Sequence, residues 1–460
     1  MSKYTTFGTA LFTAAAIAVS TLNAAPADSA DLQSLREQVH ALEQQLKILA
    51  RQIEIKDEAA AAAAPNTPKI TVNDKGVTLA SADAANSIKL RGLVQLDSRL
   101  FFNDNGIVNN AFVLRRARII SEGTFAKNYS FQIVPEFGGG SVALVDANFS
   151  IAVTPQLQFK LGRFKAPIGL ELLQSDSWTF FDERSIVTNL VPNRDLGILA
   201  TGDILGGRVN YSVGILGGVA DGAQTTNTDF DNEKDVVGRV FATPFKDDPT
   251  SPLQGLSVGI SGSLGRQKGT AGRTAGYRTD GQQTFFSYAA TTIADGQTWR
   301  VSPQVDYRNG SFGFLGEYVL STVNVRPSAT GAKAELQNRA YQLAAGYVLT
   351  GENSSYAGVV PSNNFDFSKG TWGAFEVAAR FANLKIDSAT FPLYASAASN
   401  ADETTSYGLG LNWYLSKAVR LTFDLYQTKF GYAKGAPAVL TNAVIRQDEK
   451  SFLTRFQIAF

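Results

Sequence analysis

The sequence predicts an all-β transmembrane barrel of about sixteen antiparallel strands, preceded by a short α-helical coiled coil. Three observations lead to this prediction. Apolar and polar residues alternate in one segment after another from Ser87 onward. The chain contains no run of about 18 apolar residues, so alternating strands are the pattern that remains for crossing a membrane. A heptad pattern precedes the first of these segments.

Residues 1–24 have the composition of a secretory signal peptide. Lys3 supplies the positive start, an apolar run extends from Ala10 to Val19, and Ala24 is a small residue suited to cleavage. Removal of this segment would place the mature chain outside the cytoplasm. Together with the predicted barrel, it indicates the outer membrane of a Gram-negative bacterium.

Residues 31–56 carry apolar residues at alternating intervals of three and four, which is the seam of a coiled coil. One such helix cannot bury its stripe alone, so the pattern predicts association with other copies of the chain. A helix folded back on its own protein is the alternative, and the seam does not decide between two and three strands. The seam consists of Leu32, Leu35, Val39, Leu42, Leu46, Leu49 and Ile53.

Residues 57–86 read as a linker. They begin rich in alanine and then contain Pro65 and Pro68, which favours a spacer that is partly helical and then extended. Within it, Thr71 to Ala84 forms either a small hairpin or a continuation of the spacer.

The barrel is predicted over residues 87–460. Leu157, Phe159 and Leu161, for example, alternate with polar or small neighbours. An inner face of polar or tiny residues suits a water-filled lumen better than the packed core of a soluble β-sandwich. The expected strands start near residues 87, 110, 128, 142, 156, 196, 207, 235, 254, 298, 312, 337, 370, 403, 418 and 448. Tight links at one end and long loops at the other are expected, the long ones being 166–195, 218–234, 266–297, 351–369 and 386–402.

The composition argues against several classes of function. A net charge of +1 gives no reason to expect a nucleic-acid partner. The absence of cysteine excludes disulfides and thiolate metal sites. The single histidine, His40, lies in the predicted coiled coil, which removes most routes to acid–base catalysis. We therefore expect no enzyme, no catalytic residue, no metal and no cofactor.

Positive charge gathers on the predicted inner face between Ala111 and Gly169. Arginine and lysine there would favour anions; the alternative is that they only balance inward acids such as Glu136. Arg115 and Arg116 are adjacent, so both face the lumen only if a bulge interrupts the strand. The candidate lumen cations are Arg91, Arg115, Arg116, Arg118, Lys160, Arg163 and Lys165, with Arg300, Arg420 and Arg455 on later strands.

The barrel resembles the phosphate-selective porin O and P family through six motifs in the family's order. This resemblance implies a homotrimer of sixteen-stranded barrels in outer-membrane lipid, passing small anions such as phosphate or polyphosphate, with a constricting loop at 166–195. It also implies an anion site in which Arg115 and Arg116 match a paired arginine and Asp146 matches an aspartate. The motifs are Leu114-Arg115-Arg116-Ala117-Arg118, Leu161-Gly162-Arg163-Phe164-Lys165, Gly169-Leu170-Glu171, Arg194-Asp195-Leu196-Gly197, Tyr341-Gln342-Leu343 with Tyr347-Val348-Leu349-Thr350-Gly351-Glu352, and Gly410-Leu411-Asn412-Trp413-Tyr414.

The sequence also departs from the family's phosphate specialists. They resemble one another in an arginine where this chain has Leu93, although Arg91 can substitute, and in lysines where it has Leu172 and Ser130. These departures leave dicarboxylates and other small anions open as solutes. A predicted coiled coil in the periplasm also leaves open a structural role, as a tether between the outer membrane and peptidoglycan.

Overall fold

The structure, a computed structural model, describes residues 29–63, 67–102, 108–224, 231–271, 274, 276–436 and 448–460. It divides into two units, Met1–Thr67 and Pro68–Phe460. The predicted signal peptide, residues 1–24, lies outside the described residues. In the ranges just given, no helix is both long and apolar enough to span a membrane.

The first unit contains the helix α1 (Ser29–Ala63), which continues beyond the predicted boundary at residue 56. Alanine is the strongest helix former, and the alanine-rich start of the expected linker is helical for that reason. The seam side chains are uncovered in the single chain: Leu35, Leu42 and Leu46 are 61%, 59% and 67% exposed. The coiled coil itself remains a prediction.

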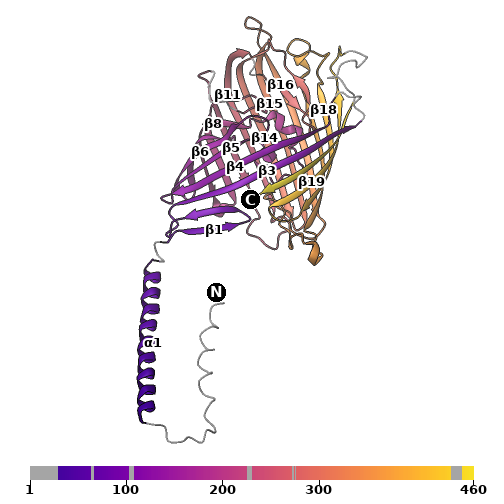
Figure 1. The fold of residues 1–460 in the computed structure, drawn as a ribbon. Coiled ribbons are helices and arrows are strands. Elements are labelled where there is room, and N and C mark those ends of the chain that lie inside the picture. Colours follow the sequence, from indigo (N-terminus) through magenta and orange to yellow (C-terminus); the bar gives the residue numbers. More distant parts are fainter. Residues whose placement is uncertain are drawn as a thin grey trace. The chain divides into compact units, whose positions relative to one another are not determined.

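In the second unit, sixteen strands of the described residues close into an antiparallel barrel, because β20 pairs with both β19 and β3 (Figure 1). This confirms the predicted fold class. The strands are β3 (Ser87–Phe102), β4 (Ala111–Phe125), β5 (Tyr129–Glu136), β6 (Ala143–Thr154), β7 (Leu157–Lys165), β8 (Arg194–Ile204), β9 (Val209–Leu216), β10 (Asp235–Ala242), β11 (Leu256–Ala271), β14 (Ile293–Asn309), β15 (Phe312–Arg326), β16 (Ala334–Val348), β17 (Ala374–Lys385), β18 (Glu403–Tyr414), β19 (Val419–Gly431) and β20 (Asp448–Ala459). The largest shift from an expected start is at β14, which begins at Ile293 rather than near residue 298.

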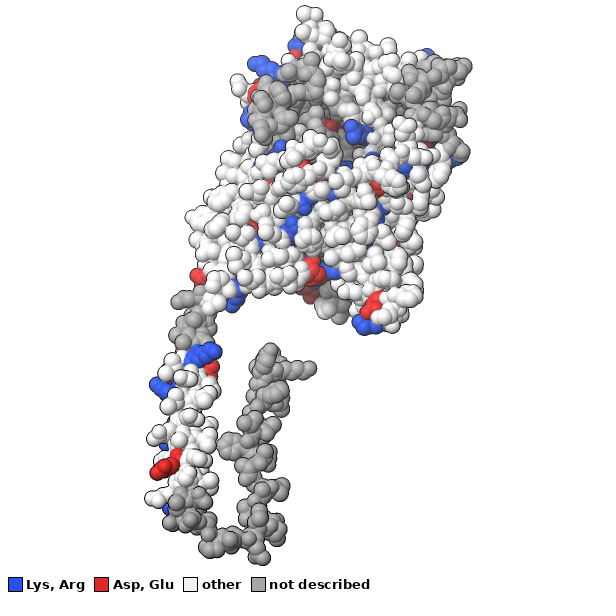
Figure 2. Space-filling model, viewed as in Figure 1, with Lys and Arg blue, Asp and Glu red and all other residues white. Residues whose placement is uncertain are grey.

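The two faces of the wall differ as lipid and lumen require. On β16, Leu343 and Tyr347 are about half exposed on the outside, whereas Asn338 and Gln342 are buried inside. Residues other than Lys, Arg, Asp and Glu form most of the barrel face seen in Figure 2. Apolar side chains therefore cover the outside, and polar ones gather within.

A hairpin precedes the barrel. It consists of β1 (Lys69–Asn73) and β2 (Gly76–Ala80), and β2 pairs with the first residues of β3. The segment 71–84, left open above, is therefore largely a hairpin that extends the barrel sheet. The expected linker 57–86 is helical up to Ala63 and strand-forming from Lys69.

Tight links define one end of the barrel, which we call the turn end; the opposite end is the loop end. At the loop end lie the long connections 166–193, 217–234, 272–292 and 386–402, and the third of these carries β12 (Gly276–Arg278) and β13 (Thr284–Ser287). One of the predicted long connections lies elsewhere. Residues 349–373 join β16 to β17 at the turn end, since successive connections alternate between ends. The expectation that all long loops share one end is therefore wrong for predicted loop 351–369.

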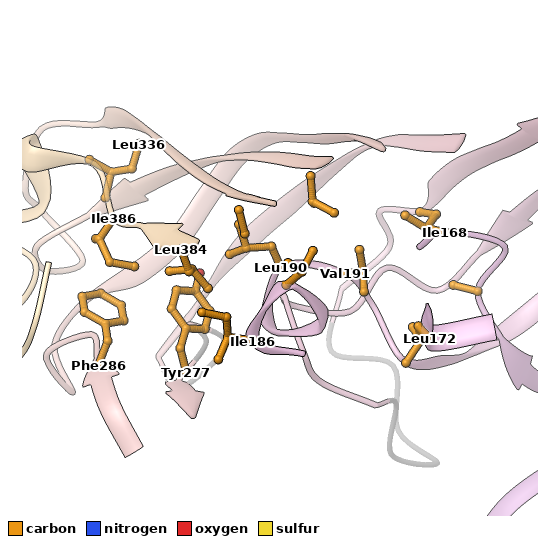
Figure 3. Close-up of a cluster of buried hydrophobic side chains, with 14 of the residues drawn as sticks. Ile168, Leu172, Ile186, Leu190, Val191, Tyr277, Phe286, Leu336, Leu384 and Ile386 are labelled. Atoms are coloured by element: carbon orange, nitrogen blue, oxygen red, sulfur yellow. The ribbon is translucent and has the colours of Figure 1, made fainter. Parts of the chain in front are cut away.

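Part of the interior is packed and apolar rather than water-filled. Ile186 and Leu190 of the 3-10 helix η2 (Ile186–Leu190) lie beside Tyr277, in a cluster that also contains Leu336 and Leu384 from the wall (Figure 3). The loops at this end therefore fold into the barrel and form a dry core there.

The tiny inner residues of β16 and β18 make room for aromatic rings. A Cβ added at Gly346 would overlap the Phe180 ring, and one at Gly410 would lie 3.1 Å from the Phe181 ring. The interpretation of these glycines as a water-lined wall is therefore wrong, because they border the loop that carries Phe180 and Phe181.

Candidate functional site

The loop 166–193, called the inward loop below, crosses the barrel interior. At its start, Lys165 Nζ donates 2.8 Å hydrogen bonds to the carbonyls of Leu172 and Gln174. Leu172 belongs to the one-turn helix α2 (Leu170–Leu173). Further along, Asn412 of β18 donates to the carbonyl of Phe180 at 2.7 Å. The loop thus leaves β7 and reaches the wall that β15 to β19 form.

The long connection 349–373 meets the inward loop from the turn end. The Tyr356 hydroxyl donates to the Leu170 carbonyl at 2.6 Å, and Gln174 Nε2 donates to the Tyr356 carbonyl at 2.9 Å. Trp178 packs against the small cluster around Val348 and Tyr414. Segments from both ends therefore occupy the half of the lumen next to β15–β19.

The other half contains a cavity of about 700 Å³ between the inward loop and strands β4 to β6. Among the residues that the structure describes, its wall carries six arginines and four carboxylates, an excess of two positive charges. We call it the arginine cavity. Its charged lining consists of Arg115, Arg116, Arg118, Arg184, Arg194 and Arg278 with Glu136, Asp176, Glu183 and Asp221.

A β-bulge in β4 directs two adjacent arginines inward. Along β3, Gln95 pairs with Arg116 and the next residue, Leu96, pairs with Leu114, which leaves Arg115 as the extra residue. Leu114 is exposed on the outer face, whereas Arg115 and Arg116 both line the cavity. The bulge required for this arrangement is therefore present.

Carboxylates of the inward loop hold the arginines of β4. Arg115 makes a two-pronged contact with Glu183, at 2.5 and 3.0 Å. Arg116 Nη2 lies 3.4 Å from Asp176, and Arg118 donates to the other oxygen of the same carboxylate. The loop and this wall are thus joined by charge-assisted hydrogen bonds, which are stronger than neutral ones.

The two loop carboxylates stay ionised. Burial by itself raises the pKa of Asp176, but Arg116, Arg184 and Arg118 together hold that pKa well below its usual range. Burial likewise opposes ionisation of Glu183, and the charges of neighbouring arginines, Arg115 first, lower the pKa of this carboxyl well below its usual range. Both groups therefore carry a negative charge throughout the neutral range.

Asp146 positions another arginine. Arg194, the first residue of β8, contacts both oxygens of Asp146 at 3.1 and 3.2 Å and itself lines the cavity. A second bulge occurs here, since Val134 pairs with Asp146 and Pro135 pairs with Leu144. Proline lacks the N–H of a regular ladder, so Pro135 is the sequence signal for this bulge.

The family model described as phosphate-selective porin O and P matches residues 88–460. The chain belongs to this family. It is therefore an outer-membrane anion porin, and it is a channel rather than an enzyme. The predicted family and location are confirmed.

Named relatives agree with this assignment. Porin O of Pseudomonas aeruginosa is 26% identical over 424 residues, which cover 84% of this chain and 91% of Porin O. Solved structures share the fold at low sequence identity. The outer membrane channel DcaP of Acinetobacter baumannii has a TM-score of 0.52 at 12% identity, covering 82% of this chain and 98% of DcaP. OmpT of Vibrio cholerae in its trimer form has a TM-score of 0.51 at 10% identity, covering 82% and 100%.

The cations expected on β7 have three different positions in the porin. Lys165 holds the inward loop, as described above. Lys160 lies on the inner face, 5.9 Å from the ring centre of Phe164, and within the described ranges no carboxylate lies at ion-pair distance from it. Arg163 pairs in register with Leu196, an outward-facing residue, so Arg163 falls on the outer phase of the strand. None of the three belongs to the cavity lining that the structure describes.

None of the remaining sequence candidates belongs to the cavity lining that the structure describes either. Arg91 contacts both oxygens of Glu122 at 2.9 and 2.8 Å near the start of β3. Arg300, Arg420 and Arg455 are fully buried inside the barrel. They contact loop segments: Arg420, for example, donates to the carbonyl of Thr179. These arginines hold the packed interior together.

Three cavity arginines were not among the sequence candidates. Arg184 and Arg278 come from inward-folded loops, and Arg194 comes from a strand end. Alternation gives no orientation outside regular strands. The motif that contains Arg194 was a partial signal, but no pattern pointed to Arg184 or Arg278.

Proposed function

We propose that this porin lets small anions diffuse passively through the arginine cavity, with phosphate and small carboxylates among them. The observation that carries the proposal is the excess of arginine over carboxylate in the cavity wall. Positive charge fixed on a narrow wall raises the local concentration of anions and lowers that of cations. Guanidinium groups also match the paired oxygens of phosphate and carboxylate.

The pairing of the arginines supports general anion passage over tight binding of phosphate. Arg115, Arg116 and Arg118 each have a protein carboxylate within 3.4 Å. A passing anion therefore meets the net positive potential of several arginines that are paired with carboxylates, and not a single unpaired guanidinium. Such a field lets an ion both enter and leave. Polyphosphate and dicarboxylates belong to the same class of candidate solutes.

Reversal potentials in planar bilayers under a salt gradient test the proposal. We expect a reversal potential with the sign of an anion-preferring channel. A reversal potential that indicates cation preference would overturn the proposal. Titrating phosphate, sulfate and a small dicarboxylate against chloride current then tests breadth. Similar half-blocking concentrations support a general anion pore, whereas a far lower value for phosphate alone would indicate phosphate specificity.

The variant Arg116→Ala assigns the selectivity to the cavity. Removing one charge at about 8 Å from a passing ion changes its energy by about 0.5 kcal/mol in a mostly aqueous pore, with opposite signs for an anion and a cation. We therefore expect the anion-to-cation permeability ratio to fall about fivefold. Arg91→Ala is the matched control, because Arg91 pairs with Glu122 outside the cavity. Equal effects of the two variants would contradict the assignment.

We further propose that the porin is a homotrimer whose α1 helices form a three-stranded coiled coil in the periplasm. The uncovered heptad seam of α1 supports association of copies, and OmpT, which shares the barrel fold, is known in a trimer form. Burying leucine and isoleucine side chains stabilises association by about 1.5–3 kcal/mol for each fully buried side chain.

Deleting residues 31–56 tests the role of the helix. We expect trimers that dissociate at a lower temperature in detergent, while the inserted trimers keep their conductance. Thermal dissociation followed by light scattering, and single-channel recording, measure the two properties. Unchanged trimer stability would remove the coiled coil from the proposal, and lost conductance in intact trimers would contradict the separation of roles.

A further inference from the structure

Asp176 of the inward loop has an unusual surrounding for a carboxylate. It lies within ion-pair distance of Arg116 at 3.4 Å and Arg194 at 4.0 Å, and it directly contacts Arg118 and Arg184. Its side chain is only 5% exposed. Four guanidinium groups of the described chain thus converge on one carboxylate, a setting that would equally suit a small oxyanion.

Glu183, on the same loop, gathers a second set of arginines. Arg115 contacts it with two prongs, and Arg99 and Arg455 lie 3.2 and 3.1 Å away. Among the residues that the structure describes, seven arginines therefore lie within ion-pair distance of Asp176 or Glu183. Without these carboxylates the arginines would repel one another across a partly desolvated wall.

The inward loop is also held by contacts that do not involve Asp176. Phe180 and Phe181 are docked in the small-residue wall of β16 and β18. Lys165 holds the beginning of the loop through the carbonyls of Leu172 and Gln174. With the loop fixed by these contacts, the charge of Asp176 acts mainly on the field within the cavity.

We propose that Asp176 is a tethered counter-anion that sets how strongly the pore binds permeant anions, and thereby its selectivity among them. The inference rests on the proposed anion function. Asp176 occupies part of the positive field that a divalent oxyanion would otherwise neutralise. It keeps anion binding shallow and conduction fast, and it disfavours retention of multivalent anions over chloride.

The charge of Asp176 must be removed by substitution, because surrounding arginines keep it ionised. Asp176→Asn preserves the size of the side chain and raises the net charge of the cavity lining from two to three. We expect the half-blocking phosphate concentration for chloride current to fall about five- to tenfold. Sulfate block should strengthen similarly, and chloride conductance should saturate at a lower concentration.

Two variants serve as controls in the full-length assembled porin. Asp176→Glu keeps the charge and should retain wild-type block. Glu122→Gln removes a carboxylate that pairs with Arg91 outside the cavity, and it should also leave the block unchanged. Wild-type phosphate block in Asp176→Asn, in a channel that is itself anion-selective, would overturn the inference. A cation-selective wild type would instead overturn the proposed function.

A charge-balanced double variant covers the case in which Asp176→Asn does not assemble. Asp176→Asn with Arg184→Gln removes both members of one contact, which protein interiors tolerate better than removal of one partner. The cavity charge then equals that of the wild type. The double variant is compared with Arg184→Gln alone, from which it differs only at residue 176. We expect its half-blocking phosphate concentration to be about five- to tenfold lower than that of Arg184→Gln, and equal values would overturn the inference.

Discussion

The wall formed by β3 to β8 and the wall formed by β14 to β19 enclose the same lumen but present different chemistry to it. The first carries Arg115, Arg116 and Arg118 beside an open cavity. The second carries Gly346 and Gly410 under the aromatic rings of the inward loop. Charged groups face an open space in the first wall. In the second wall, inward charges such as Arg420 are buried, and small residues admit the rings of the loop.

The difference shows that an inner face of a barrel has two separate properties. Charged side chains must stay near water or a partner, so they either face the open cavity or contact the folded-in loops, as Arg420 does. Glycine and alanine leave room, but that room can be filled by a folded-in loop as well as by water. Small residues on the inner face therefore do not by themselves predict a water-filled lumen.

The largest expected structural effect comes from disturbing the filled half. Gly346→Leu would drive a side chain into the Phe180 ring, and overpacking of this kind costs about 1–3 kcal/mol. We expect displacement of the inward loop, with conductance raised at least about twofold and anion preference weakened. Gly238→Leu is the control, because a Cβ there meets only the Ser212 carbonyl at 3.9 Å. Single-channel recording measures both, and a Gly346→Leu channel of normal conductance would contradict the docking role.

Removing one arginine from each half sharpens the comparison. Arg118→Gln takes a charge from the cavity, and we expect the anion-to-cation permeability ratio to fall about fivefold. Arg420→Gln takes a buried charge that contacts the Thr179 carbonyl in the filled half. It should lower thermal stability but change the permeability ratio by less than about twofold, because no ion passes beside it. Similar selectivity losses in both variants would refute the division into two halves.

A smaller effect is expected for Lys160, which faces the lumen outside the cavity lining. Lys160→Ala should reduce anion preference by less than about twofold at 0.1 M salt. The effect should disappear at 1 M salt, where charges are screened beyond about 3 Å. Reversal potentials at the two salt concentrations measure it. An effect as large as that of Arg118→Gln would mean that the selectivity of the pore is set next to β7 and not in the arginine cavity.

The smallest expected effect is that of pH. Asp176 and Glu183 have depressed pKa values in the folded porin, so their charges persist from pH 8 to well below the ordinary range of about 4. We expect the contribution of Asp176 and Glu183 to anion preference to be constant between pH 8 and 5. The stability that their ion pairs provide should be lost only as the pH falls below about 4. A permeability ratio that rises in wild type but not in Asp176→Asn as pH falls from 7 to 5 would show that Asp176 titrates there.

Regular alternation was sufficient to predict the strands. The adjacency of Arg115 and Arg116 predicted a bulge only on the condition that both face the lumen. The part of the barrel interior that is filled by loops could not be predicted in this way. Gly346 alone does not reveal whether water or Phe180 lies against it, because that depends on where a loop nearly 170 residues earlier in the chain folds. Arg184 and Arg278 were missed for the same reason, since their orientation follows from tertiary docking and not from local periodicity.

The bulge in β4 also makes the charge of the pore easy to change during evolution. On its two sides, Leu114 and Arg116 already oppose neighbouring residues of β3, Leu96 and Gln95. Loss of Arg115 would leave an uninterrupted ladder, with every other partner unchanged. A single inserted or deleted codon can therefore adjust the number of cations in the channel while the rest of the wall keeps its registration.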